Sequence, residues 1–106
     1  MLALIREVRS TVDMELERAQ ENFGQHYASA HEGFGVLSEE LFEAETETIH
    51  INAIKNWLMN ALHANDTAQM VDVLDELTER ATLAACEYIQ VAAVAQKMID
   101  TLRTVK

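Results

Sequence analysis

The sequence contains no proline, and its three glycines all lie between positions 24 and 35. Because proline and glycine are the residues that most often interrupt regular structure, the chain after Gly35 can continue as uninterrupted helix. That stretch is rich in alanine, leucine, glutamate, methionine and glutamine, which all favour helix. The sequence therefore predicts an all-α protein, and its 106 residues fit one domain.

Basic residues are also scarce, with 8 lysines and arginines against 18 aspartates and glutamates and a net charge of −10. This balance argues against binding to nucleic acid or to an anionic membrane, since both require a basic surface. No apolar run approaches the ~20 residues of a membrane span, and the amino terminus lacks a signal-peptide apolar block. The single Cys86 excludes an internal disulfide and suits a reducing compartment, so we expect a cytoplasmic protein.

Apolar residues three or four apart predict a first helix from about Leu2 to Asn22. Its expected buried stripe is Ile5, Val8, Val12, Leu16 and Ala19. The segment from Phe23 to Gly35 holds all the glycines. We interpret it as a loop, or as a helix start interrupted by a loop.

A second helix is expected to begin near His31 or Phe34 and to end at Asn65, a residue suited to the left-handed conformation that terminates helices. Asp66 is a good N-cap for a third helix, and Gln69 completes a capping-box pattern. The expected seam of the second helix is Leu37, Leu41, Ala44, Thr48, Ile51, Lys55, Leu58 and Leu62. The expected seam of the third is Met70, Leu74, Leu77, Ala81, Ala84, Tyr88, Val91, Ala95, Met98 and Leu102.

Two long helices joined by a short turn must pack antiparallel, as a helical hairpin. Each would be ~45–55 Å long at ~1.5 Å per residue. A three-helix monomer of that length leaves much apolar surface uncovered. We therefore predict a homo-oligomer, a dimer or tetramer with a four-helix-bundle core.

The hairpin brings acidic residues of both long helices to the same height. Glu43 and Glu87 are each 22 positions from Asn65, and Glu40 and Gln90 are each 25 positions from it. Both pairs have i, i+3 spacing, which places each pair on one face of its helix. The sequence therefore predicts that Glu40 and Glu43 face Glu87 and Gln90 across the hairpin.

Three carboxylates in one place repel one another unless a proton or a bound cation compensates their charge. Hard cations such as Mg²⁺ and Mn²⁺ prefer oxygen ligands of this kind. We interpret Glu40, Glu43 and Glu87 as a divalent-metal site. The alternative is a solvated acidic helix face, which acid-rich helices commonly form.

Two segments resemble the signatures of the MazG-like all-α nucleotide pyrophosphohydrolases. They are HEGFGVLSEELFEAE from His31 to Glu45 and ERATLAACEYIQVAAVAQKMID from Glu79 to Asp100. The similarity is strongest to the small phage- and prophage-borne members, which often open this region with HEG and use E-x-x-Q before an alanine-rich run. The resemblance implies a MazG-like oligomeric fold.

The family carries E-E-x-x-E on one helix and E-x-x-D on the next. Glu39, Glu40 and Glu43 match the first motif, and Glu87 matches the first acid of the second. Gln90 stands where the family has aspartate, and a neutral amide is a poorer ligand for a hard cation. The chain also departs from the family in the 43 residues between Glu43 and Glu87, a longer gap than is usual.

The resemblance implies Mg²⁺- or Mn²⁺-dependent cleavage of a nucleoside triphosphate between its α and β phosphates, giving a monophosphate and pyrophosphate. It implies the following positions for the metal: Glu40, Glu43, Glu87 and Gln90. Glu39 is the candidate catalytic residue, which would orient or deprotonate water. Lys97 and Arg80 are candidates for phosphate contacts, or are surface cations.

Other functions stay open. The fold can serve a non-enzymatic interaction protein or scaffold, or a sensor that binds nucleotide without turnover. Glu47 and His50 form an E-x-x-H motif like those of di-iron carboxylate bundles, but the chain has no second such motif. The base, the sugar and the pathway are not specified by the sequence.

Overall fold

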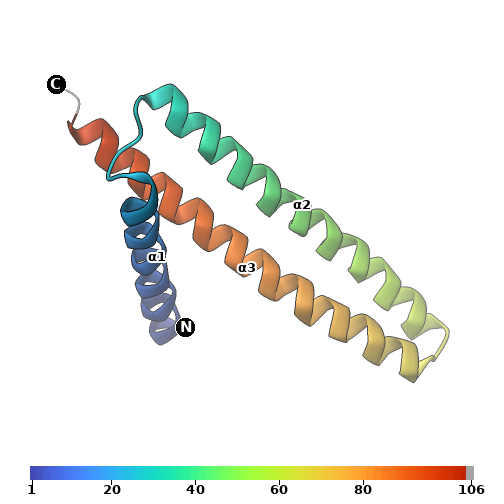
Figure 1. Ribbon diagram of the computed structural model, residues 1–106. Helices are drawn as coiled ribbons and strands as arrows, with labels where there is room; N and C mark the ends of the chain where they lie inside the picture. The colour runs from blue at the N-terminus through green and yellow to red at the C-terminus, as the bar shows by residue number, and fades with distance from the viewer. Residues whose placement is uncertain (105–106) are drawn as a thin grey trace.

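The computed structural model describes residues 1–104, and their secondary structure is entirely helical (Figure 1). The helices are α1 (Leu2–Phe23), α2 (Ala30–His63) and α3 (Thr67–Thr104). The all-α prediction is thereby confirmed, with no strand in this range. None of the three is both long and apolar enough to cross a membrane.

Helices α2 and α3 form a long antiparallel hairpin (Figure 1). In the connecting turn Asn65 has a φ of 52°, the left-handed conformation that asparagine tolerates. One side-chain oxygen of Asp66 accepts a hydrogen bond of 3.0 Å from the backbone N–H of Gln69. The predicted turn and N-cap are confirmed, and they set the register between the two long helices.

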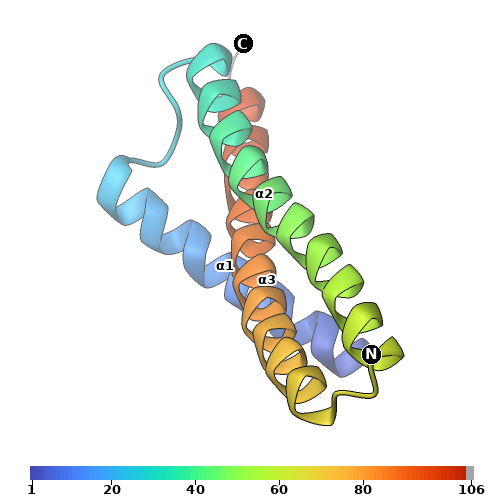
Figure 2. The same cartoon turned by 90° about the vertical axis from the view of Figure 1, so that its right-hand side faces the viewer.

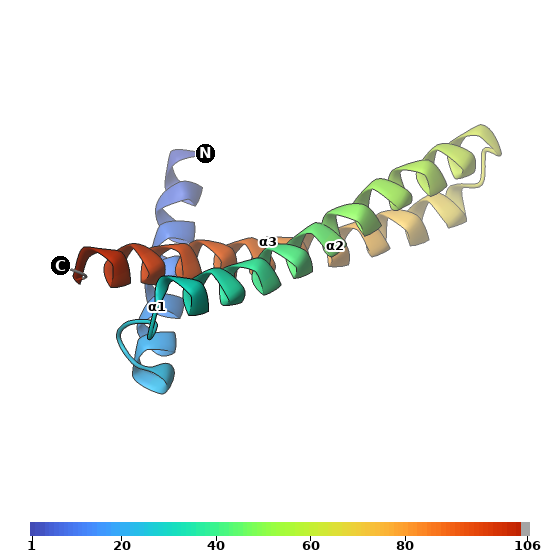
Figure 3. The same ribbon diagram turned by 90° about the horizontal axis from the view of Figure 1, so that it is seen from above.

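Helix α1 crosses the carboxyl-terminal half of α3 at a steep angle (Figures 2 and 3). It makes no close backbone contact with α2. The hairpin extends well beyond α1 at the end that carries the turn, which gives the molecule extents of 62 × 30 × 22 Å. Three helices therefore meet at one end of the molecule, while the other end is a two-helix arm.

Helix α2 begins earlier than the glycine content predicts. Ser29 caps it by accepting a hydrogen bond of 3.1 Å from the N–H of Glu32, so the loop covers only residues 24–29. The expected start near His31 is confirmed to within one residue, whereas the alternative start at Phe34 and the interpretation of the whole segment up to Gly35 as a loop are wrong. Gly33 is a buried helical residue, and a Cβ there would lie 2.9 Å from Cγ of Met98 and 3.0 Å from Cδ2 of Tyr27. The absence of a side chain at Gly33 therefore allows Met98 and Tyr27 to pack closely against α2.

The interface between α2 and α3 is lined by small and branched residues. Its buried apolar residues are Ala44, Ile54, Ala61, Val73, Ala84 and Ala93. The heptad seam predicted for α2 is wrong near the turn, because Lys55 is exposed and Leu62 is 57% exposed. The buried positions there are Ile54 and Ala61, each one residue earlier, because the angle at which α3 packs decides which side of α2 is covered.

Helix α3 also departs from its predicted seam at several positions. Leu74, Tyr88 and Leu102 of its predicted seam are substantially exposed, whereas Val73 and Thr101 are buried. In α1 no residue is fully buried, and Ile5 and Val8 of the predicted stripe remain partly exposed. The chain therefore has a narrow core and a large exposed apolar surface.

Candidate metal centre

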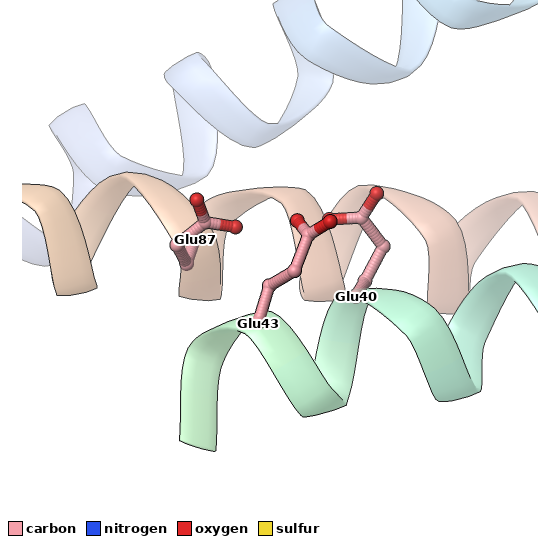
Figure 4. A group of neighbouring side chains, drawn as sticks. All are labelled: Glu40, Glu43 and Glu87. Atoms are coloured by element: carbon pink, nitrogen blue, oxygen red, sulfur yellow. The ribbon is translucent and has the colours of Figure 1, made fainter. Parts of the chain in front are cut away.

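Three glutamates converge where α2 and α3 face each other. Glu40 and Glu43 come from α2 and Glu87 from α3, and each offers a carboxylate oxygen within 4.8 Å of the others (Figure 4). The convergence expected from equal distances to the turn is confirmed for these three residues. We call them the carboxylate cluster.

Alanines beside the carboxylate cluster allow the two helices to approach. Ala44, next to Glu43, is 0% exposed, and Ala84, one turn before Glu87, is also buried. The distance between packed helices depends on the side chains at their contact, so small residues bring the backbones close. The longer glutamate side chains on either side can then meet.

The cluster carries mutually repelling charges. The pKa of Glu40 is raised first by partial burial and then by the charges of Glu43, Glu87 and Glu39. Partial burial also raises the pKa of Glu87, followed by the charge of Glu43, a hydrogen bond shared with Glu43 and the charge of Glu47. Among residues 1–104, no lysine, arginine or histidine forms an ion pair with the three clustered acids. Their charge is therefore uncompensated by the protein.

These pKa shifts predict how stability depends on pH. Because the folded-state pKa values lie above the ordinary 4.5, the folded protein binds these protons more tightly than the unfolded chain. Without divalent cations, the cluster should therefore destabilise the protein progressively as pH rises from about 4.5 through the raised values. Thermal melts in EDTA between about pH 4 and pH 8 will measure this loss. Glu87→Gln should reduce the slope of melting temperature against pH. An unchanged slope would contradict the prediction.

Gln90, the fourth predicted ligand, is engaged by α1. Its Nε2 donates a hydrogen bond of 2.8 Å to a carboxylate oxygen of Glu15, whose other oxygen lies 3.0 Å from a guanidinium nitrogen of Arg18. Gln90 and Glu40 line the same cavity. The structure therefore uses the amide to join α1 to the edge of the carboxylate cluster, and its role as a metal ligand stays a prediction.

The candidate catalytic residue Glu39 is exposed beside the carboxylate cluster and is not part of it. Its charge contributes to the raised pKa of the neighbouring Glu40. Glu39 is therefore close enough to influence the cluster while remaining accessible to water.

The two candidate substrate cations lie in different surroundings. Arg80 pairs with Glu76 at 3.0 Å and with Glu47 at 3.6 Å, and its position seven residues before Glu87 places it about 10 Å away along α3. The other oxygen of Glu47 is buried without a hydrogen-bond partner. Lys97 is buried, and its ammonium lies over the ring of Tyr27. Of the two, only Lys97 lines the cavity that contains Glu40.

Sequence reasoning did not identify Glu15 or Tyr27 as parts of this region. Glu15 lies three residues after Val12 on the edge of the α1 stripe, a position that can turn toward α3. Ser29 and Glu32 form a capping pattern that would have shortened the predicted loop and placed Tyr27 directly before α2. The E-x-x-H pair is not part of a metal-ligand group within residues 1–104, since Glu47 turns to Arg80.

The comparisons with known proteins identify no relative: no family model, no curated protein and no solved structure matches this chain.

Proposed function

We propose that this protein is a divalent-cation-dependent pyrophosphohydrolase of nucleoside triphosphates, in which Glu40, Glu43 and Glu87 hold the cation. The observation that carries the proposal is the convergence of these three carboxylates from two helices, within 4.8 Å of one another. The MazG-like motifs described above support the same assignment, because the acids that converge are those that the motifs would use.

The donor set of the carboxylate cluster fits Mg²⁺ or Mn²⁺. It consists only of carboxylate oxygens, which hard cations prefer, and it carries more negative charge than any neighbouring basic group compensates. Two of the three acids have raised pKa values, so a bound cation would relieve the repulsion that now favours their protonation.

When bound, the cation would supply positive charge that neutralises phosphate oxygens. Glu39 stands exposed on the same helix as Glu40 and Glu43, where its carboxylate can orient a water molecule or accept its proton. Attack of that water on the α phosphate, with departure of the β and γ phosphates as pyrophosphate, gives the nucleoside monophosphate. Such an enzyme acts where nucleotides and Mg²⁺ are abundant, and we propose the cytoplasm as its location.

The decisive experiment is product analysis. The purified protein is incubated with each common ribo- and deoxyribonucleoside triphosphate and with Mg²⁺ or Mn²⁺, and both pyrophosphate and monophosphate are quantified. The proposal expects equal amounts of the two products, with none formed in EDTA. Release of inorganic phosphate alone would indicate a different reaction, and absence of any product together with no thermal shift on adding the cation would refute the enzyme.

The second candidate is a non-enzymatic interaction protein. It is favoured by the many large apolar side chains left exposed on the two-helix arm, including Trp57, Met59 and Val71. It is also favoured by Gln90, which stands in place of an acid and is engaged by Glu15. A scaffold would bind no nucleotide, and its stability would not depend on divalent cations.

We further propose that the protein forms a homo-oligomer, a dimer or tetramer, through this exposed apolar surface. A single hairpin arm covers only one side of each helix, and a second hairpin against it would complete a four-helix bundle. Light scattering coupled to size-exclusion chromatography should give at least twice the monomer mass of 11.9 kDa. A mass of one monomer at micromolar concentration would refute the assembly.

A further inference from the structure

A cavity of about 370 Å³ adjoins the carboxylate cluster. Glu40 and Gln90 line it on the side of the cluster, and Lys97 and Tyr27 also line it. Its apolar walls come from all three helices, through Ala19, Phe23, Val36 and Val94. The volume falls within the range of small-molecule sites, ~300–1,000 Å³, and the mixture of apolar walls with a few polar groups is typical of them.

The most unusual group in this cavity is the ammonium of Lys97. The residue is only 3% exposed, and its Nζ lies 4.4 Å from the centre of the Tyr27 ring. Within residues 1–104, no carboxylate lies within ion-pair distance of this Nζ and no hydrogen bond from it is formed. In the part of the chain that the structure describes, the only fully buried side-chain polar atom without a hydrogen-bond partner is Oε2 of Glu47, so the ammonium, with its three donors, is still open to the cavity. The cavity therefore contains a cation that lacks an oxygen acceptor.

Tyr27 is held in place over Lys97 by the short loop before α2. Its backbone N–H donates a hydrogen bond of 3.0 Å to Oγ1 of the buried Thr101, and Gly33 leaves room for its ring. The pKa of Tyr27 is raised by burial and then by the charges of Glu40 and Glu32, so its hydroxyl lies within electrostatic reach of both acids. The ring thus connects the cation end of the cavity with the end at the carboxylate cluster.

Lys97 and the residues at the carboxylate cluster lie at different heights along α3. Lys97 follows Gln90 by seven residues and Glu87 by ten, which corresponds to about 10 and 15 Å along the helix. That separation exceeds the distance between adjacent phosphate groups, but it suits the span from the α phosphate to the far edge of a nucleobase. The backbone of Lys97 is therefore set back from the carboxylate cluster, toward the part of the cavity where the base of a nucleotide held at the cluster by its phosphates would lie.

We propose that this cavity binds the nucleoside moiety of the substrate and that Lys97 donates a hydrogen bond to a carbonyl oxygen of the base. This inference rests on the proposed function and specifies its substrate class: nucleotides whose base carries a keto group at C6 of a purine or C4 of a pyrimidine, namely guanine, uracil and thymine. Adenine and cytosine present an amino donor at the corresponding position. That donor would oppose the ammonium and leave it unpaired.

The first test is kinetic. Wild-type protein should show a KM for guanine, uracil or thymine triphosphates that is roughly tenfold or more below that for adenine or cytosine triphosphates. Lys97→Met should raise the KM for the keto bases by a similar factor and remove the preference, with the change falling on KM more than on kcat. Lys97→Arg, which keeps the donor, should restore part of the preference. Lys55→Met, a change at an exposed lysine of α2, is the matched control.

The second test does not depend on hydrolysis. Saturation-transfer NMR in EDTA measures binding of guanosine and uridine, which lack phosphates, with adenosine and cytidine for comparison. Wild-type protein and the Glu43→Gln/Glu87→Gln variant should both bind the keto nucleosides, whereas Lys97→Met should not. Circular dichroism of each variant establishes that it is folded.

The outcomes separate the two proposals. Nucleoside binding that requires Lys97, with no triphosphate hydrolysed, would overturn the proposed hydrolase and retain the nucleoside cavity. Hydrolysis with no base preference, or with a KM unchanged by Lys97→Met, would overturn this inference and retain the hydrolase.

Discussion

Replacing Glu40 and Glu43 together by glutamine is expected to reduce cation-dependent pyrophosphate release by roughly 10²-fold or more. The two substitutions remove two of the three charges that converge within 4.8 Å, while glutamine keeps nearly the same side-chain volume. The remaining Glu87 would hold a divalent cation only weakly. The measurement is the initial rate of pyrophosphate release with Mg²⁺ or Mn²⁺ at saturating triphosphate.

A thermal melt of the same variant distinguishes loss of the site from loss of the fold. Without divalent cations the double variant should melt at a higher temperature than the wild type, because repulsion within the carboxylate cluster is relieved. It should also lose the stabilisation that Mg²⁺ gives the wild type. Glu45→Gln removes one charge from an exposed position of the same helix and is the control. Equal responses of the control and the double variant would contradict a specific role for the cluster.

Truncation of Ile54 is expected to have the largest effect on stability. Ile54 is 1% exposed and is the largest fully buried side chain, located on the arm where only α2 and α3 pack together. Ile54→Ala should cost about 2–5 kcal/mol, through lost burial and the cavity left behind. For a domain near 100 residues this corresponds to a melting temperature lower by about 10–20 °C.

Ile49 provides a matched comparison, since it is an isoleucine of the same helix that is 66% exposed. Ile49→Ala should change the free energy of unfolding by less than about 0.5 kcal/mol. Urea denaturation of both variants at one protein concentration makes the comparison. A loss at Ile49 as large as that at Ile54 would contradict this prediction and would place Ile49 inside the interface of the proposed homo-oligomer.

The sequence alone determined the hairpin and the carboxylate cluster within it. The lack of proline, together with glycines confined to one segment, allowed two long helices, and Asn65 and Asp66 located the turn between them. Because every helical residue adds the same rise, equal distances from the turn place Glu43 opposite Glu87. These features depend only on local conformation and on the number of residues between each glutamate and the turn, so they can be predicted without knowing how the helices pack.

Only the tertiary structure decided what surrounds the carboxylate cluster. The burial of Lys97, its contact with Tyr27 and the hydrogen bond between Gln90 and Glu15 all depend on how α1 and the following loop lie against α3. The last of these contacts joins residues 75 positions apart. The packing of Gly33 also depends on the tertiary structure, because the missing side chain leaves room for the side chains of Met98 and Tyr27. Local sequence patterns do not encode such contacts, because they result from the angle at which whole helices pack.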